Sequence, residues 1–465
     1  MTRQKLVSPV LILLLAGCSM IPGYETPTVT TPAQWSGSEA GASIDDVSVS
    51  HDWWASFGSE ELNKLMNDAL LDNNDLRAEL QRVEQSRAAL KIAGASLLPS
   101  ANVAFDISKT VAGNAANSTN LGAGSGISYE LDLFGANRAV KAGASASLLG
   151  SQYAQDALKL VVMGDVAQTY FSILNNRERL RIADQNLHNA REVLRIVTAR
   201  VEAGTESSLE LSQQKSALAS SEAARASIEQ QINKSENALA VLLGKPPQSV
   251  SVALKNLDSL TVPNIKPGQP SSLLSRRPDI RAAEMALVAA NADIGVARAA
   301  FFPSVNLGAD WSVAASGFGN PATTALALAS SLSVPLFQGG RLEGGVEKAT
   351  ARQAELAENY RKSVLVSFQE VEDALASIKS AQLREQSLNV AKAEAENSYN
   401  LSKSRYDAGA IDFQTLLDTQ GALLNAEDSY AQAKFDRLLA AVDLFKALGG
   451  GWASDNAQQT PAVSK

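Results

Sequence analysis

The chain repeats itself, and this internal duplication constrains its fold more than any other feature. The segment ASLLPSANVAF, residues 95–105, returns without a gap as AAFFPSVNLGA, residues 299–309. Around it, residues 75–103 align on residues 279–307 with nine identities in 29 positions, and further matches keep an offset of 203 to 205. A unit of about two hundred residues has been duplicated, so we expect two halves of similar structure.

Each half carries two segments in which apolar and polar residues alternate, which is the pattern of a half-buried strand. In the first segment, Val103, Phe105 and Ile107 alternate with polar neighbours. The four expected strands cover about residues 101–111, 124–134, 303–314 and 324–336. Segments of about ten residues are long enough to cross a bilayer as tilted strands.

Four strands cannot close a barrel, and an open sheet would leave two exposed edges. Three chains would supply twelve strands, so the pattern favours a homotrimer in a lipid bilayer. A soluble sandwich is the alternative. We expect no transmembrane helix after the start of the chain, because polar residues interrupt the remaining apolar runs.

Very long helices make up the rest of each half. Hardly any proline or paired glycine interrupts residues 138–200 or 341–407, and a helix of ~65 residues is roughly 100 Å long. Apolar and small residues at alternating spacings of three and four predict coiled-coil packing. Ala203-Gly204 and Ala408-Gly409 end these helices and turn the chain into a second long helix. Each half therefore contains a helical hairpin whose tip is far from the strands.

The first residues predict export and a lipid anchor. Arg3 and Lys5 precede a short apolar run that ends in Leu15-Ala-Gly-Cys18, a sequence similar to the bacterial lipobox. The expected signal peptide is residues 1–17, with Cys18 lipidated and an outer-membrane destination. The alternative is a plain secretory signal with an unrelated cysteine. The net charge of −8 becomes about −10 on cleavage, which argues against a nucleic-acid partner.

No catalytic constellation is evident, so we do not expect an enzyme, a cofactor or a metal site. Cys18 is the only cysteine, and His51 and His188 are isolated. Residues 276–280, RRPDI, could form an anion site, but a helix start with proline in its first turn is the simpler interpretation.

Two acidic residues close to the tips invite a functional hypothesis. Glu210 follows Gly204 by six residues, and Asp418 follows Gly409 by nine. Threefold symmetry would gather such carboxylates into rings around one axis, where they would attract cations and repel one another. The alternative is that each acid lies on a solvated helix face.

Motifs along nearly the whole chain resemble the outer-membrane efflux protein family, which is TolC-like, and within it the lipoprotein channels of tripartite RND drug pumps. The order of these motifs, together with the duplication, carries the resemblance. They are the lipobox at 15–18, SYELDLFG at 128–135, RRPDI at 276–280, FP at 302–303, PLFQGG at 335–340, LLD at 416–418 and ALGGGW at 447–452.

The resemblance implies an α+β membrane protein: a trimeric twelve-stranded β-barrel in the outer membrane, continuous with a long periplasmic α-helical barrel. It implies a passive exit duct for drugs or other solutes, closed at its periplasmic end until a periplasmic adaptor and an inner-membrane RND-type pump engage the tips. The adaptor-contacting residues would be Ala203, Gly204, Ala408 and Gly409.

The same resemblance places a gate at the tips. Asp418 would line the closed aperture with Leu417, Glu210 would be the acid of the first hairpin, and Tyr406 would help to hold the aperture shut. Some relatives carry a bulky apolar residue four positions before the aspartate, where this chain has Gln414. An apolar gate layer is therefore not expected at that position.

The expected organisation is a lipidated linker at 18–59, a first repeat at 60–260, a second repeat at 261–452 and a flexible tail at 453–465. The alternative function is a lipid-anchored periplasmic coiled-coil adaptor or structural lipoprotein. Such a protein would have similar helical hairpins but would not need amphipathic strands.

Overall fold

The computed structural model describes residues 19–36, 50–111, 118–254, 256–450 and 452. The predicted signal peptide, Cys18 and the tail at 453–465 lie outside these residues. The chain divides into two compact units. Unit 1 comprises residues 1–29, 80–154 and 279–363, and unit 2 comprises residues 30–79, 155–278 and 364–465.

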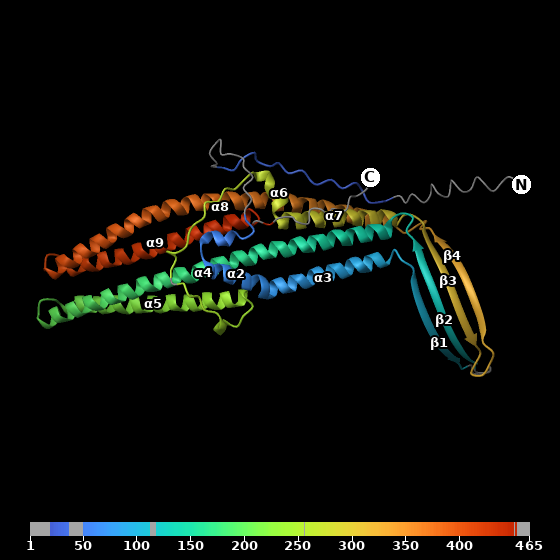
Figure 1. The fold of residues 1–465 in the computed structure, drawn as a ribbon, viewed down its shortest axis with the longest axis horizontal. Coiled ribbons are helices and arrows are strands. Elements are labelled where there is room, and N and C mark those ends of the chain that lie inside the picture. The colour runs from blue at the N-terminus through green and yellow to red at the C-terminus, as the bar shows by residue number, and fades with distance from the viewer. Residues whose placement is uncertain (1–18, 37–49, 112–117, 255, 451, 453–465) are drawn as a thin grey trace. The chain divides into compact units, whose positions relative to one another are not determined.

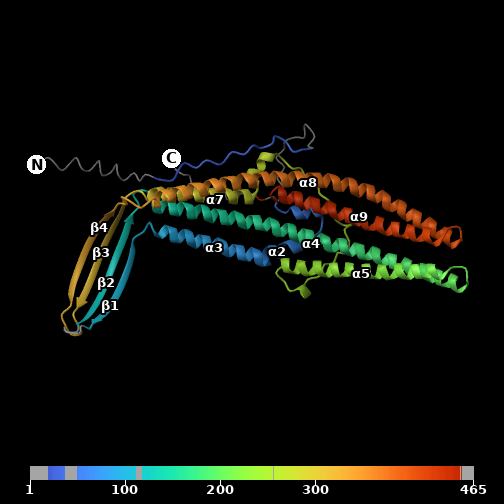
Figure 2. The ribbon, with the colours of Figure 1, turned by 180° about the vertical axis from the view of Figure 1, so that it is seen from behind.

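Unit 1 contains one antiparallel sheet with the strand order β1-β2-β3-β4 (Figures 1 and 2). The strands are β1 (Ser100–Thr110), β2 (Ser118–Leu131), β3 (Ser304–Ala315) and β4 (Thr323–Ser333). The four expected strands are all present. Among the described strands, β1 and β4 each pair on one side only, so the sheet has two free edges.

The strand β2 begins at Ser118, whereas the alternation predicted a start near residue 124 and a loop before it. Every residue from Ser118 to Ser128 pairs with β1, so the partner strand determines its length. Glycines at 122, 124 and 126 obscure the alternation. A Cβ at Gly122 would clash with Asp106, and one at Gly126 would clash with both Asn102 and Asp310. These glycines therefore make room for the polar side chains of the neighbouring strands.

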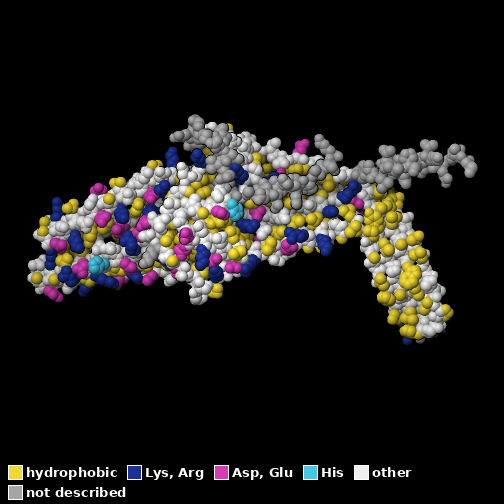
Figure 3. All heavy atoms as spheres, in the orientation of Figure 1, with side chains coloured by type: hydrophobic (Ala, Val, Ile, Leu, Met, Phe, Trp, Pro, Cys, Tyr) yellow, Lys and Arg dark blue, Asp and Glu magenta, His cyan; other side chains and the backbone are white. Residues whose placement is uncertain are grey.

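The other face of the sheet is apolar and open. Large side chains stand exposed along the edge strands, with Phe105 at 80% and Leu328 at 78%. Figure 3 shows hydrophobic side chains over much of the visible sheet, whereas charged side chains are spread over the helices. The residues that alternate with these apolar ones lie on the other face of the sheet and include Asn102, Asp106 and Asp310. The alternation seen in the sequence thus becomes two chemically distinct faces.

Unit 1 also contains helices, and a segment near the start of the described chain packs against one of them. They are α7 (Pro278–Ala299), most of α3 (Asn74–Ala95) and the first parts of α4 (Ala136–Glu202) and α8 (Arg341–Asp407). The side chain of Asn291 donates to the Pro22 carbonyl at 2.8 Å. A Cβ at Gly295 would come within 2.7 Å of Ile21. The start of the expected linker therefore packs against α7.

Unit 2 consists mainly of two helical hairpins. The first joins α4 to α5 (Ser208–Leu242), and the second joins α8 to α9 (Phe413–Ala447). Figures 1 and 2 show the two tips at the same end of this unit. Short elements precede and connect the hairpins: η1 (Trp53–Phe57), α2 (Glu60–Asp72), η2 (Pro247–Ser249), η3 (Pro270–Ser272) and α6 (Leu273–Arg276).

The core of unit 2 contains aromatic residues that we had predicted to lie in the linker at 18–59. Trp53, Trp54 and Phe57 are buried with residues of α2, α4, α5 and α9. Trp53 stacks on Phe445 with ring centroids 5.0 Å apart. Burial of these large rings removes them from water, so residues 53–59 form part of the folded unit. Trp35 is also buried, and its indole donates to the Gly268 carbonyl at 2.9 Å.

The duplication persists in backbone detail. Gly244 ends the first hairpin with φ +64°, and a Cβ there would clash with the Asp72 carbonyl. Gly449 ends the second hairpin with φ +88°, and a Cβ there would clash in the same way with the Arg276 carbonyl.

The segment RRPDI is a helix start, since α7 begins at Pro278. The Arg277 side chain donates to Glu370 and to the Ala447 carbonyl.

One described helix, α4, contains a stretch long and apolar enough to cross a membrane by length and composition. Half of that stretch is buried within the chain. A buried core helix passes the same test, so this is weak evidence for a membrane span.

Candidate functional site

The two helix tips turn through the same backbone motif. Gly204 has φ +75° and Gly409 has φ +70°. At the first tip, the Gly204 N–H bonds to the Val201 carbonyl and the Thr205 N–H bonds to the Arg200 carbonyl. Gly409 and Ala410 make the equivalent bonds at the second tip. This Schellman pattern satisfies the last helical carbonyls and requires a left-handed residue, which explains both glycines.

Glu210 belongs to a capping box at the start of α5. The Ser207 hydroxyl accepts from the Leu209 N–H at 3.1 Å, and the Glu210 carboxylate accepts from the Ser207 N–H at 3.2 Å. The Ser207 hydroxyl also bonds to that carboxylate, and this bond holds the pKa of Glu210 below its ordinary value of 4.5. The acid that we expected at the aperture therefore has a structural partner of its own.

The start of α9 is capped by a different residue. The Asp412 carboxylate accepts from the Thr415 N–H at 2.8 Å. Hydrogen bonds from Thr415 lower the pKa of Asp412. Asp412 corresponds to Ser207 in the repeat, with an offset of 205. The position of the cap is thus kept while its chemistry differs.

Tyr406 connects the second tip to the first through a set of contacts that we call the tip network, formed by Arg200, Glu206 and Tyr406. The Tyr406 hydroxyl donates to Glu206 at 3.2 Å, and the Arg200 guanidinium donates to the Tyr406 carbonyl at 2.9 Å. The same guanidinium lies 4.3 Å from the centre of the Tyr406 ring and pairs with Glu206 at 3.3 Å.

Burial explains why this network can hold the tips together. Tyr406 is only 1% exposed. Burial, reinforced by the Glu206 charge, raises its pKa to about 12, so it stays protonated and can donate. An apolar cluster surrounds it and joins three helices: Val193 and Val197 of α4, Tyr399 and Tyr406 of α8, and Phe413 and Leu416 of α9.

Asp418 and Gln414 lie on the exposed side of α9, which we call the aperture face. The Gln414 amide donates to the Asp418 carboxylate at 2.8 Å. Leu416 is buried on the opposite side, and Leu417 is half-buried against the apolar cluster. The arrangement leaves the Asp418 carboxylate available to solvent or to another chain.

The structure thus groups some of the predicted residues and separates others. Gln414 pairs with Asp418, and Tyr406 shares one cluster with Leu417. Within the described part of the chain, Glu210 bonds to Ser207 and Asp418 bonds to Gln414, and no hydrogen bond joins the two acids. Sequence reasoning missed Arg200 and Glu206. The alignment of Arg200 on Arg405 at the two tips was the available signal for the arginine.

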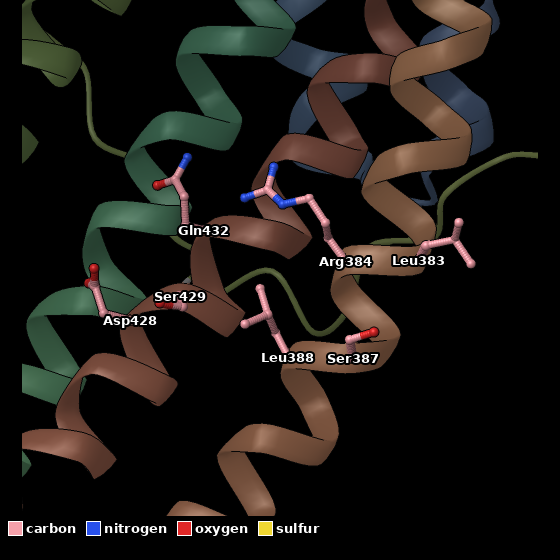
Figure 4. Close-up of a pocket in the computed structure, with 7 residues that line it drawn as sticks. All are labelled: Leu383, Arg384, Ser387, Leu388, Asp428, Ser429 and Gln432. Carbon is pink, nitrogen blue, oxygen red and sulfur yellow. The ribbon is translucent and has the colours of Figure 1, made fainter.

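A groove of ≈ 600 Å³ lies between α8 and α9, further along the helices. In Figure 4, Arg384 and Leu388 extend from α8 toward α9, and Asp428 and Gln432 come from α9. The Asp428 carboxylate is held by Arg179 of α4 at 2.5 Å, and Arg384 pairs with Asp436 at 3.0 Å. The charged side chains that line the groove are therefore already engaged in ion pairs within the chain. Among the described residues, no group of three or more His, Cys, Asp or Glu could hold a metal ion.

Comparison with known proteins agrees with this architecture. The family model described as outer membrane efflux protein matches residues 65–245 and 269–450, one match for each repeat. The pyoverdine export outer membrane protein OpmQ of Pseudomonas aeruginosa is 40% identical over 95% of this chain and 96% of its own.

Two further relatives support the assignment. The solvent efflux pump outer membrane protein SrpC of Pseudomonas putida is 33% identical over 95% of this chain and 97% of its own. The open state of the Neisseria gonorrhoeae MtrE outer membrane channel has a TM-score of 0.83 at 30% identity, covering 93% of this chain and 98% of MtrE. The chain therefore belongs to the outer membrane efflux protein family, whose members are outer-membrane channels rather than enzymes.

Proposed function

We propose that the chain is the exit duct of a tripartite efflux pump and that three copies form one duct. The observation that carries this proposal is the four-stranded sheet, which is apolar on one face, polar on the other and unpaired at both edges. Lipid suits the apolar face, and three sheets joined edge to edge leave no backbone group unpaired in the hydrocarbon.

The duct conducts passively. The polar face of the sheet lines its lumen. Within the described strands, this face carries the acidic residues Asp106, Glu130 and Asp310 and no basic residue to balance them. An adaptor and an inner-membrane pump deliver cargo at the hairpin tips, where Ala203, Gly204, Ala408 and Gly409 are exposed. Relatives named for pyoverdine and for solvents support a conduit that carries drugs and other solutes chosen by its pump.

The gate is at the tips. Three copies of Asp418 surround the axis when the hairpins converge, and the tip network holds each second hairpin against the first. Opening moves the α8/α9 hairpin away from α4, which breaks the Arg200 and Glu206 contacts of Tyr406. Glu210 lies close to this aperture but acts mainly as a cap. The exposed position of Asp418 and the burial of Tyr406 support these assignments.

Single-channel recording in planar bilayers tests the gate. The double variant Asp418→Asn/Tyr406→Phe should raise basal conductance and open probability, because it removes both the carboxylate ring and the hydroxyl bond to Glu206. The matched control is Asp407→Asn/Tyr399→Phe, which changes the same residue types on the same hairpin outside the tip network. If the first pair leaves the closed state unchanged, or if both pairs open the channel equally, the gate assignment is wrong.

A further inference from the structure

A second cavity of unit 2, of ≈ 180 Å³, lies where α4 meets the α8/α9 hairpin. We call it the hairpin pocket. Ile182 of α4, Leu257 and Ala431 of α9 give it a buried apolar lining, and Tyr430 adds an aromatic ring. The volume is several times the ~30 Å³ that one water occupies and below the roughly 300–1,000 Å³ of sites for drug-sized ligands. The pocket therefore suits a small ligand.

Four of the six charged side chains that line the hairpin pocket already pair with one another. The Arg181 guanidinium donates to the Glu178 carboxylate at 2.8 Å, and the Lys434 ammonium pairs with the Asp258 carboxylate. Each pair joins a base to an acid, so together they leave no net charge in the pocket. The two charged side chains that remain therefore decide which ligand the pocket can bind.

Lys392 of α8 and Glu427 of α9 are the two that remain. Within the described part of the chain, neither forms an ion pair or a side-chain hydrogen bond, although both are half-buried. The Lys392 ammonium lies 5.3 Å from the centre of the Tyr430 ring. Burial raises the pKa of Glu427, although Lys392 and Arg181 act against the shift. A cationic group placed against this carboxylate would offset the cost of burying its charge.

We propose that the hairpin pocket binds a small zwitterion, an α-amino acid with an apolar side chain. The ligand carboxylate pairs with Lys392, the ligand ammonium pairs with Glu427, and the ligand side chain packs on Ile182 and Leu257. A simple anion or a simple cation fits less well, because each leaves one half-buried charge of the pocket without a partner.

A ligand in this pocket holds the α8/α9 hairpin against α4. Its charged groups contact α8 and α9 through Lys392 and Glu427, whereas its side chain contacts Ile182 of α4. Opening as proposed above moves that hairpin away from α4 and removes the contact with Ile182. The ligand therefore binds the closed state more tightly and lowers the fraction of open channels. This effect on opening rests on the proposed function, whereas the binding site itself does not.

Calorimetric titration of the full chain in detergent with L-leucine tests the binding. Isocaproate, which lacks the ammonium of leucine, and isoamylamine, which lacks its carboxylate, share the branched apolar body. Each should bind about tenfold or more weakly than leucine, because one charged contact is lost. If leucine does not bind, or if either analogue binds as tightly as leucine, the zwitterion site is wrong.

Substitutions locate the site. Lys392→Gln and Glu427→Gln should each weaken leucine binding by about tenfold or more. Lys379→Gln is the matched control, since Lys379 is an exposed lysine of the same helix outside the pocket, and it should keep the affinity of the unmodified chain. Circular dichroism of each variant checks that the helices are intact. Equal affinity in all three folded variants would place the leucine elsewhere and overturn the proposal.

Recording in planar bilayers separates the pocket from the duct. Leucine should lower the open probability of the unmodified channel and leave that of Lys392→Gln unchanged. If leucine binds at the pocket and the channel conducts with an unaltered open probability, the coupling to opening is wrong and the exit duct stands. A chain that binds leucine at Lys392 and conducts under no condition would support the pocket and overturn the duct.

Discussion

Tyr406 and Asp418 show how two residues of one hairpin tip acquire different tasks from their surroundings. Tyr406 is buried and donates to Glu206 beneath the Arg200 guanidinium. A hydrogen bond to a charged partner contributes about 1.5–3 kcal/mol, so this contact stabilises the packing of the second tip against the first. Asp418 is exposed and bonded only to the adjacent Gln414 among the described contacts. In the proposed gate, this carboxylate is the group that acts on permeating ions.

Two glycines with similar backbone angles should respond differently to the same substitution. Gly204→Ala imposes the left-handed cost of about 1–2 kcal/mol and nothing more, because no atom lies within 4 Å of the new Cβ. Gly449→Ala adds a clash with the Arg276 carbonyl, and overpacking against rigid atoms costs about 1–3 kcal/mol beyond that. Thermal unfolding followed by helical circular dichroism should show the larger loss for Gly449→Ala. Equal losses would mean that the helix end shifts freely.

At the scale of elements, caps set where each hairpin returns. The capping box of α5 and the Asp412 cap of α9 occupy equivalent positions after the two glycine turns. Both start a helix within a few residues of the previous helix end, so each tip stays short. In the proposed duct, a short, fully bonded tip offers the adaptor a fixed surface.

The cap of α5 should depend on pH in a defined direction. The folded-state pKa of Glu210 lies below its ordinary 4.5, so its contribution is complete above about pH 4.5 and disappears as pH falls through the lower, folded pKa. Glu210→Gln should reduce hydrogen-exchange protection of the first turn of α5 at neutral pH, and the difference from the unmodified protein should vanish in acid. Glu222→Gln on the same helix is the control and should leave that turn unchanged. A difference that grows in acid would contradict this role.

At the scale of the whole molecule, the sheet rather than the lipid should determine membrane retention. The Cys18→Ser variant, whose residue lies outside the described part of the chain, should remain in the membrane after an alkaline wash and require detergent for extraction. A coiled-coil adaptor tethered only by lipid would become soluble. Sedimentation and immunoblotting of the washed fractions measure this. Release of a folded, soluble chain would favour the structural lipoprotein over the duct.

Much of the fold could be predicted because its signals are local. The period-two alternation around Phe105 and Trp311 and the uninterrupted stretches before Gly204 and Gly409 act over short distances along the chain. The copies of the repeat lie about two hundred residues apart, but aligning the sequence with itself reveals them directly. The start of β2 could not be predicted, because its glycines carry no alternation and only pairing with β1 extends the strand to Ser118. The capping role of Glu210 was missed, although Ser207 and Glu210 have the spacing of a capping box, which is a local signal in the sequence.

The sequence by itself determined that two similar halves exist, that each supplies two amphipathic strands and one long helical hairpin, and that the hairpins turn at Ala-Gly. These features follow from side-chain periodicity and from the conformational freedom of glycine, which need no distant partner. Only the tertiary structure decided that Arg200 and Glu206 hold Tyr406, and that residues 53–59 belong to the core of unit 2. Those contacts join residues about two hundred positions apart or bury rings beneath other helices, and no local pattern encodes such distances.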